Sequence, residues 1–495
     1  MKFNAKLLLC LISAILTALP FLVPSFSFLA YFSLIPFLYV LFYMTHTAKD
    51  AAKYGFIFGA GWYLLVLTWI FYLYPLENVC ENAALCIVLL FFVWILISFI
   101  MAFEIALFSA IFKKCNTCKV LMPYAAATLW IVMEFFQQFG EAGFTWCRIS
   151  LTQYIYTPII QSASLFGGLF LSFIIVFINA LLVLFIKDKK ALYLAASAGI
   201  FAFNILLGAA APDLKPYKEI SASLVWEDIN PDDKRAENMA EQTFKRLMGE
   251  TKKQQSELVL WTETAVPVVL TDQSSFFKEY QALCREKKFT LLAGGFTKEG
   301  ERLYSSVICI NRDGERIGSI NKRHLVPFGE YVPLRSVLRI FVPAIDKISP
   351  PDEEIAPFEG SCVIDSEIGK IGGIVCYDSC FPALSRESVR DGAQIITLST
   401  NDSWFYGSHA AKNHLSQSVF RAVENGRYVL RSANLGESCI IDNKGRIVAE
   451  EEEGKNSLSF KAGLIKENTL YTKIGDIFVI ISVLILIVAM KKRGV

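Results

Sequence analysis

A long polar block, residues 211 to 470, interrupts a chain whose other segments are apolar enough to cross a lipid bilayer. A helix needs about 20 apolar residues to span the hydrocarbon core. Runs of this kind predict eight spans, at 7–24, 26–44, 54–74, 83–112, 120–138, 163–186, 191–211 and 473–490. The content of 54% hydrophobic residues and the mean hydropathy of +0.44 are also too high for an ordinary soluble protein. The chain is therefore expected to be a membrane protein with a polar domain outside the bilayer.

Lysine and arginine indicate on which side of the membrane the polar block lies. Short cytoplasmic loops retain basic residues, and all the basic clusters fall on one side of the predicted spans. These clusters are Lys2 and Lys6; Lys49 and Lys53; Lys113, Lys114 and Lys119; Lys187, Lys189 and Lys190; and Lys491, Lys492 and Arg493. We therefore expect a membrane domain with seven transmembrane helices (1–211), an extracytoplasmic domain (212–470), and a last span with a basic cytoplasmic tail (471–495).

Short β-rich runs alternate with helical patterns inside the polar block. Buried strands are predicted at 223–225, 258–261, 290–293, 371–375 and 395–398, and helices at 235–255 and 382–390. An Asp313-Gly314 pair between runs at 304–310 and 316–320 indicates a β-hairpin. The block is therefore expected to have an α/β fold with some antiparallel pairing.

Three separated stretches of the polar block contain residues suited to acyl transfer. They read Trp-Thr-Glu-Thr-Ala-Val-Pro at 261–267, Asn-Lys-Arg-His-Leu-Val-Pro-Phe-Gly-Glu at 321–330, and Val-Cys-Tyr-Asp at 375–378. Glu263, Lys322 and Cys376 thus supply a base, a cation for a developing oxyanion, and a thiol nucleophile. The cation and the base are expected to increase the fraction of reactive thiolate near neutral pH. Glu263 and Cys376 also follow strand ends, where open α/β sheets place their active sites.

The sequence around these residues resembles the carbon-nitrogen hydrolase, or nitrilase, superfamily. The likeness continues through Asn401-Asp402-x-Trp404-Phe405 and Arg431-Ser432-x-Asn434, and into the apolar half through Phe144-x-Trp146 and Phe166-Gly167-Gly168-Leu169. Together with the predicted spans, the chain resembles the apolipoprotein N-acyltransferase family. This resemblance implies an exported nitrilase-like α-β-β-α sandwich, with Glu263 as general base, Lys322 as the oxyanion-side cation and Cys376 as nucleophile.

Glu330, Tyr377 and Asp378 complete the predicted site as supporting residues. Glu330 is expected to orient Lys322 or to assist proton transfer. Asp378 stands where the family usually has glutamate, so any hydrogen bond of this shorter side chain is expected to need a shifted backbone. The resemblance implies a phospholipid acyl donor, a diacylglyceryl-modified apolipoprotein as acceptor, and a bacterial cytoplasmic membrane as the lipid bilayer. No metal or organic cofactor is implied.

Other functions would use the same residues differently. A membrane-tethered amidase or nitrilase would let water attack the thioester and would hydrolyse a small amide, whereas a transporter or sensor would only bind a ligand. His324 or His414 could form a papain-like pair with a cysteine, but His324 lies within the lysine motif and is expected to make structural hydrogen bonds. The net charge of +2 and the lack of a basic stripe argue against nucleic acid as a partner.

Three further features of the sequence are candidates for a role. Residues 331–342 place apolar side chains at helical spacing, which predicts either a membrane-surface lid or an ordinary core helix. Glu104 and Glu134 lie within predicted spans, where a carboxylate either serves function or makes interhelical hydrogen bonds. The spacing of Cys115 and Cys118 suits a redox or metal site, but one pair on the reducing side of the membrane is a weak indication.

Overall fold

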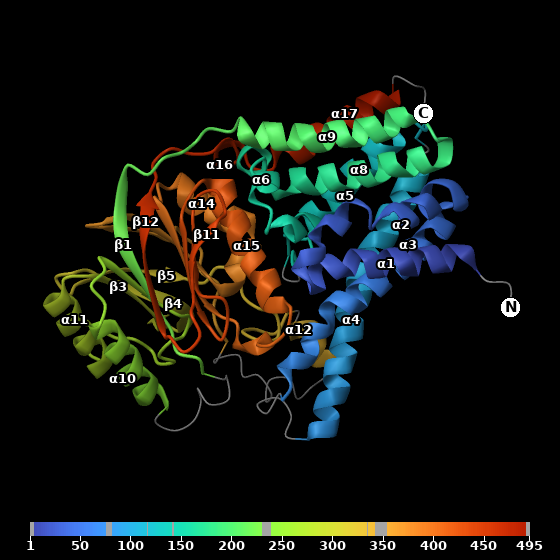
Figure 1. Ribbon diagram of the computed structural model, residues 1–495. Helices are drawn as coiled ribbons and strands as arrows, with labels where there is room; N and C mark the ends of the chain where they lie inside the picture. The colour runs from blue at the N-terminus through green and yellow to red at the C-terminus, as the bar shows by residue number, and fades with distance from the viewer. Residues whose placement is uncertain are drawn as a thin grey trace.

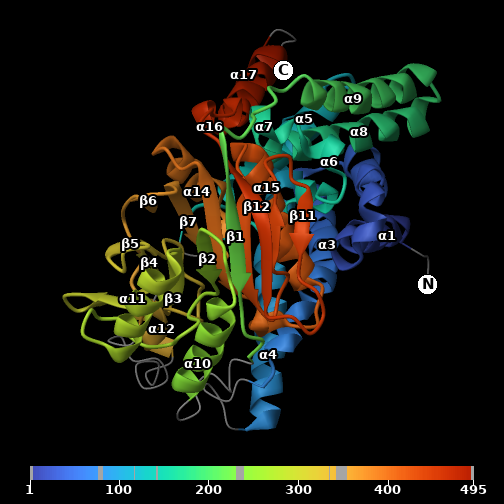
Figure 2. The same cartoon turned by 60° about the vertical axis from the view of Figure 1, so that its left-hand side comes forward.

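A helical bundle and a two-sheet domain lie side by side in the computed structural model (Figure 1). The structure describes residues 4–75, 82–115, 117–140, 143–229, 239–333, 335–341 and 354–491. The same arrangement is seen when the molecule is turned by 60° (Figure 2). The chain leaves the bundle after α9 (Ala191–Ala209), forms the domain, and returns to the bundle at α17 (Ile477–Lys491).

Apolar helices occupy all eight positions at which spans are predicted. Six of them are long and apolar enough to cross a membrane: Ala5–Leu22, Pro24–Met44, Ala48–Leu73, Ala83–Lys114, Gly168–Asp188 and Ala191–Ala209. The other two, α5 (Met122–Phe136) and α17, have 15 residues each. At about 1.5 Å per residue they are about 22 Å long, less than a hydrocarbon core of about 30 Å. The described residues therefore support a multi-pass membrane protein, but the predicted number of eight spans is not confirmed.

Short 3₁₀ and π segments break up several helices of the bundle. In chain order it contains α1 (Ala5–Leu22), η1 (Pro24–Tyr31), α2 (Ile35–Tyr39), η2 (Val40–Met44), α3 (Ala48–Val66), η3 (Leu67–Leu73), α4 (Ala83–Lys114), α5, η4 (Ile149–Gln153), α6 (Thr157–Ile160), α7 (Ala163–Phe166), α8 (Gly168–Asp188) and α9. α8 is buried along most of its length, whereas α4 exposes Val88, Phe92 and Phe103 and projects from the edge of the bundle in both views (Figures 1 and 2). An apolar surface of this extent is expected to face lipid.

Two six-stranded sheets form the polar domain. One has the order β12-β1-β2-β3-β4-β5 and the other β11-β10-β9-β8-β7-β6. Strands β1 to β3 pair in parallel, as do β7 to β9, and the outer strands pair antiparallel. The strands are β1 (Lys218–Val225), β2 (Leu258–Trp261), β3 (Thr290–Glu299), β4 (Arg302–Ile310), β5 (Arg316–Asn321), β6 (Val363–Ser366), β7 (Gly369–Val375), β8 (Ile395–Asn401), β9 (Val429–Asn434), β10 (Cys439–Ile441), β11 (Ile447–Glu450) and β12 (Ser457–Leu464). All five predicted buried strands are present, and so is the hairpin, which turns at Gly314 between β4 and β5.

Helices cover the outer face of each sheet, which gives the domain four layers. α10 (Met239–Lys252) and α11 (Ser275–Lys287) cover the first sheet, and α14 (Pro382–Arg390) and α15 (Ala410–Asn425) cover the second (Figures 1 and 2). The apolar core between the sheets includes Leu224, Leu260, Ile371, Val375 and Leu430. This is the α-β-β-α sandwich that the resemblance implies. Short helices η7 (Cys376–Cys380), η8 (Ser403–Phe405) and α16 (Leu470–Ile474) connect the layers.

α15 lies between the second sheet and the bundle and is buried from Asn413 to its last residue, Asn425. Its residues Leu415 and Phe420 belong to the same hydrophobic cluster as Trp130 of α5 and Ile175 of α8. Because one continuous core joins the domain to the bundle, burial of apolar surface fixes the orientation of the sandwich on the membrane helices.

The predicted lid lies partly outside the described residues. A short helix, α12 (Arg335–Phe341), follows the lysine motif, in agreement with the helical spacing. Arg335 pairs with Glu354, whose carboxylate also accepts a hydrogen bond from the Val332 amide at 2.8 Å. Outside the described part lie Leu334, residues 342–353 and the side chains of Val337, Leu338 and Phe341. The lid therefore stays a prediction.

The basic loops predict that the domain and the α8–α9 connection face opposite sides of the membrane. A cysteine replacing Lys298, on the exposed end of β3, should react with a membrane-impermeant thiol reagent added to spheroplasts. A cysteine replacing Lys190, which caps α9, should react only after permeabilisation. Lys190 is preferred over Lys189, whose φ of 57° is left-handed. The unsubstituted chain controls for native thiols, and the reverse labelling pattern would overturn the predicted orientation.

Candidate active site

Three loops at one edge of the sandwich carry the predicted catalytic residues. Glu263 follows β2 and Lys322 follows β5 in the first sheet, whereas Cys376 follows β7 in the second. The loop after β2 packs so closely on β3 that a Cβ at Gly294 would lie only 2.0 Å from the Thr262 carbonyl oxygen, which requires a glycine at this position. The sandwich therefore brings a carboxylate, an ammonium and a thiol from two sheets to one place.

The Lys322 ammonium is buried between two carboxylates. Its Nζ donates to Glu263 Oε1 at 2.9 Å and to Glu330 Oε1 at 2.8 Å. Burial alone would lower the pKa of Lys322, but the two carboxylates outweigh it and hold the pKa well above its ordinary value. Lys322 is therefore a permanent cation. The other oxygen of Glu330 accepts from the Val326 amide at 2.8 Å, a position suited to orienting Lys322.

The Cys376 thiol is protonated in the resting site. Burial and the negative charge of Glu263 raise its pKa above the ordinary value, and Lys322 and a hydrogen bond with Thr400 oppose this only in part. Because two carboxylates already pair with Lys322, the sulfur gains little from that cation. The expectation of an increased thiolate fraction is therefore wrong for the resting site. The thiol has to lose its proton to a base during the reaction.

The backbone of these loops is strained at Cys376 and close to the other predicted catalytic residues. Cys376 has φ 47°, Thr264 φ 43° and Phe328 φ 62°, all in the left-handed region. A non-glycine residue held there costs about 1–3 kcal/mol, and such positions cluster at functional sites. The surrounding contacts must therefore hold the nucleophile loop in place.

Asp378 joins the lysine loop to the nucleophile loop. Its carboxylate accepts hydrogen bonds from the backbone amides of Val375 at 3.1 Å, Arg323 at 3.2 Å and His324 at 2.7 Å. Burial raises the pKa of Asp378, although Arg323 and these amides favour the charged form. The aspartate that replaces the usual glutamate thus reaches backbone partners on both loops.

His414 of α15 lies directly behind the nucleophile. Its Nε2 lies 2.8 Å from Ser379 Oγ and 3.3 Å from the Cys376 carbonyl oxygen, and its Nδ1 lies 2.8 Å from Asp402 Oδ1. The indole of Trp146, from the bundle, stacks on the His414 ring with centroids 5.5 Å apart. His414 therefore binds the backbone of the nucleophile loop, whereas the papain-like alternative would have it pair with the thiol.

Asp402 keeps a negative charge in this buried network. Burial would raise its pKa, but Arg431 and His414 outweigh it and lower the pKa to about 2. Ser379, His414 and Asp402 are arranged like a Ser-His-Asp triad. Ser379 is fully buried, so the arrangement holds the loop and presents no second nucleophile. The sequence motifs included Asp402 and Arg431 but gave no sign of this network.

Tyr377 and His324 lie on the side of the site that faces the bundle. The Tyr377 hydroxyl donates to the Gly143 carbonyl oxygen at 3.0 Å. The His324 ring stacks on Phe381 with centroids 3.5 Å apart, and burial together with Lys322 lowers the pKa of His324 to about 4. His324 is therefore neutral near pH 7 and packs as an aromatic ring, whereas structural hydrogen bonds were expected of it.

Glu104 and Glu134 connect elements of the bundle. Gln137 donates to Glu104 at 2.8 Å, and the Trp130 indole and the Ile149 amide both donate to Glu134 at 2.9 Å. These contacts agree with the hydrogen-bonded alternative for both residues. Within the described ranges, no group of three or more His, Cys, Asp or Glu side chains is arranged to hold a metal ion.

Two family models match the chain. The carbon-nitrogen hydrolase model matches residues 214–462, and the model of the apolipoprotein N-acyltransferase N-terminal domain matches residues 13–181. The apolipoprotein N-acyltransferase of Geobacter metallireducens is 30% identical over 95% of this chain and 92% of its own length. The Thermotoga maritima protein of the same name is 28% identical, over 98% and 93%. The nitrilase-superfamily protein Nit3 of Saccharomyces cerevisiae has a TM-score of 0.39 and 22% identity, over 51% of this chain and 93% of Nit3.

A two-sheet sandwich with this arrangement of loops defines a carbon-nitrogen hydrolase domain, here built onto a membrane bundle. Both parts of the chain are matched, and the match to full-length relatives covers nearly all of it. The chain belongs to the apolipoprotein N-acyltransferase family and is a membrane-bound acyltransferase.

Replacing Glu263 with glutamine should separate two effects of this carboxylate on Cys376. Its negative charge raises the pKa of the thiol, so Glu263→Gln should speed alkylation of Cys376 by iodoacetamide at pH 8, by about tenfold for each unit of pKa lost. Acyl transfer should fall at the same time, because glutamine cannot take the thiol proton. Mass spectrometry of the Cys376 peptide measures the alkylation. Glu257→Gln, at the other end of β2, is the control, and slower alkylation in Glu263→Gln would contradict this electrostatic account.

Replacing His414 with phenylalanine should misplace the nucleophile without removing it. The ring can still stack on Trp146, but the hydrogen bonds to Ser379 and the Cys376 carbonyl oxygen are lost. We expect kcat for acyl transfer to fall by up to about 100-fold with a smaller change in KM, because a displacement of about 1 Å has this effect. His409→Phe, at the residue that caps the N-terminus of α15, is the control. Equal losses in both variants would identify His414 as merely structural.

Proposed function

We propose that this chain moves a fatty acyl group from a membrane phospholipid, through a thioester on Cys376, to the α-amine of the lipid-modified N-terminal cysteine of an apolipoprotein. The observation that carries the proposal is the buried Lys322 cation, held by Glu263 and Glu330 beside a protonated thiol. The membrane helices favour a lipid as the acyl donor, and the names of the relatives favour an apolipoprotein as the acceptor.

In the first half-reaction, Cys376 Sγ attacks the carbonyl carbon of a phospholipid ester while Glu263 takes the thiol proton. The carbonyl oxygen gains negative charge, which Lys322 stabilises because its ammonium is desolvated and already in place. The ester carbon–oxygen bond then breaks, and Glu263 returns the proton to the leaving alkoxide. A lysophospholipid departs and leaves Cys376 as an acyl thioester.

In the second half-reaction, the α-amine of the acceptor attacks the thioester carbonyl carbon. Glu263 takes a proton from the amine, and Lys322 again stabilises the oxyanion. The carbon–sulfur bond breaks, and the departing sulfur takes the proton back. The products are an N-acylated lipoprotein and the free Cys376 thiol, so atoms and charges balance over the cycle.

The supporting residues act through the catalytic ones. Glu330 holds the Lys322 ammonium, and Asp378 keeps the lysine loop at a fixed distance from the nucleophile loop. Tyr377 ties the nucleophile loop to the bundle through Gly143. No metal ion or organic cofactor takes part in this scheme, because a base, an oxyanion cation and a thiol suffice for acyl transfer.

The proposed location is a bacterial cytoplasmic membrane with the catalytic domain on its extracytoplasmic side. The one-sided distribution of lysine and arginine in the short loops supports this orientation. A domain on that side would meet lipoproteins after export and phospholipids of the adjacent leaflet.

Incubation with phospholipid should leave an acyl group on Cys376, which peptide mass spectrometry detects and neutral hydroxylamine removes. Cys376→Ala should abolish the adduct, whereas Cys380→Ala, at a buried thiol in the same turn, should keep it. Cys376→Ser should also fail, because a hydroxyl is the weaker nucleophile at this pH. An adduct that persists in Cys376→Ala would overturn the nucleophile. Hydrolysis of a small amide without lipid would instead favour the membrane-tethered amidase.

A further inference from the structure

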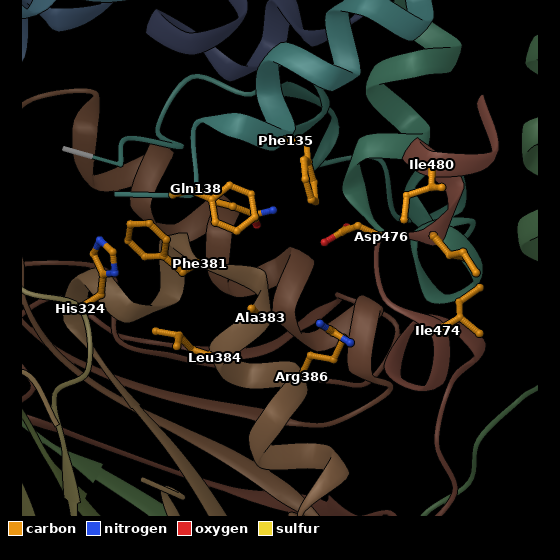
Figure 3. A pocket seen from close by; sticks show the side chains of 12 residues that line it. Phe135, Gln138, His324, Phe381, Ala383, Leu384, Arg386, Ile474, Asp476 and Ile480 are labelled. Atoms are coloured by element: carbon orange, nitrogen blue, oxygen red, sulfur yellow. The ribbon is translucent and has the colours of Figure 1, made fainter. Parts of the chain in front are cut away.

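A groove of about 480 Å³ lies where the catalytic domain meets the bundle (Figure 3). Its walls come from the end of α5, the start of α14, and the segment that joins α16 to α17. Cys376 is not among the lining residues, so the groove is separate from the nucleophile. His324 and Phe381, stacked at 3.5 Å, form the wall nearest to the catalytic loops.

The wall on the membrane side is apolar and open to its surroundings. Phe135 lies in the last turn of α5 and Phe139 just after that helix, and Ile477 and Ile480 lie in the first turn of α17. Phe139 is 56% exposed and Ile480 59% exposed, although both are large apolar residues. Such a surface is expected to contact lipid chains.

The groove lies where the two short helices of the bundle end. α5 and α17 are each about 8 Å shorter than a hydrocarbon core of about 30 Å, given about 1.5 Å per residue. The C-terminus of α5 and the N-terminus of α17 both reach the groove. A helix that is too short makes the bilayer thin locally or leaves space that lipid must fill. The groove offers that space to one lipid chain.

The opposite wall holds a charged side chain without a full set of partners. Arg386 of α14 points into the groove (Figure 3), and its Nε is buried without a hydrogen-bond partner in the described part of the chain. The guanidinium lies against Gly475, where a Cβ would come within 2.7 Å of it, and over the Tyr471 ring at 5.9 Å. Packing therefore holds Arg386 in a fixed orientation, and its donors remain for an anion.

Asp476 limits which anions fit. Its carboxylate faces the groove from the α17 side (Figure 3) and accepts a hydrogen bond from the Tyr471 hydroxyl at 3.4 Å. A guanidinium binds phosphate oxygens well, because its donors form a planar fork. Because Asp476 places a negative charge near the phosphate position, a singly charged phosphodiester is favoured over an anion of higher charge.

We propose that this groove binds one membrane glycerophospholipid, with its phosphodiester on Arg386 and an acyl chain along α5 and α17. The chemistry follows from an exposed apolar wall, formed by the ends of two membrane helices, that faces an arginine across the groove. This site goes beyond the proposed acyl transfer, because it needs neither Cys376 nor thioester chemistry. A lipid there would contact both the bundle and the domain, and so should stabilise the folded chain by mass action.

The test uses the full-length chain with Cys376→Ala, which cannot consume the lipid. Native mass spectrometry in detergent should show one retained dioleoyl phosphatidylglycerol, and dioleoylglycerol, which lacks the phosphate, should bind at least about tenfold more weakly. Arg386→Gln should reduce retention of the phospholipid by a similar factor and remove its effect on the melting temperature. Arg390→Gln, at an exposed arginine of the same helix, is the matched control.

Two further variants make the outcome decisive. Asp476→Asn should strengthen phosphatidylglycerol binding, because it removes a negative charge that faces the phosphate, and Ala383→Trp should fill the groove and abolish binding. Equal retention in Arg386→Gln and Arg390→Gln, or equal binding of the two lipids, would overturn the proposal. The Cys376 adduct, measured in the unsubstituted chain, reports separately on the proposed function. Arg386→Gln should still form that adduct with a short-chain, water-soluble ester.

Discussion

The catalytic edge depends on one interaction, the burial of the Lys322 ammonium between Glu263 and Glu330. Removing such charges from water costs several kcal/mol per ion, so a buried ion cluster is poor evidence for stability. The ion cluster instead fixes the positions of the loops: Lys322 links the loop after β2, which carries Glu263, to the turn that carries Glu330. Burial is the main reason that the pKa of Cys376 is raised, Glu263 raises it further, and Lys322 opposes both only in part.

A second set of contacts couples this edge to the membrane helices through α15. Arg421 donates to the Ser379 carbonyl oxygen at 3.0 Å and pairs with Glu424, which in turn accepts from the Gly168 amide at the start of α8 at 3.0 Å. The nucleophile turn is thus bound by α15 on one side, and its own Asp378 binds the lysine loop on the other. The contacts of Arg421 and those of Asp378 together hold Cys376 in its strained backbone conformation.

The sequence predicted the strands, and it indicated which three residues lie together at one edge of the sandwich, because both are local patterns. Glu263, Lys322 and Cys376 lie in motifs whose neighbours also match, and each strand is a short apolar run. The hydrogen-bond network of His414, Asp402 and Ser379 could not be predicted from the sequence. His414 lies on α15, Asp402 follows β8 and Ser379 lies in η7, so only tertiary packing brings them together. The thiol state was predicted wrongly, since charge sign along the chain says nothing about which carboxylates already pair with Lys322. The span number was uncertain for a similar reason, because hydropathy does not show where α5 and α17 end.

Burial sets the resting state of the proposed nucleophile. Desolvation raises the pKa of Cys376, so the free chain holds a thiol that is slow to react with stray electrophiles. Under the proposed mechanism, Glu263 takes the thiol proton only when an ester carbonyl is in place for attack. The bound substrate, and not the resting site, would therefore activate the sulfur.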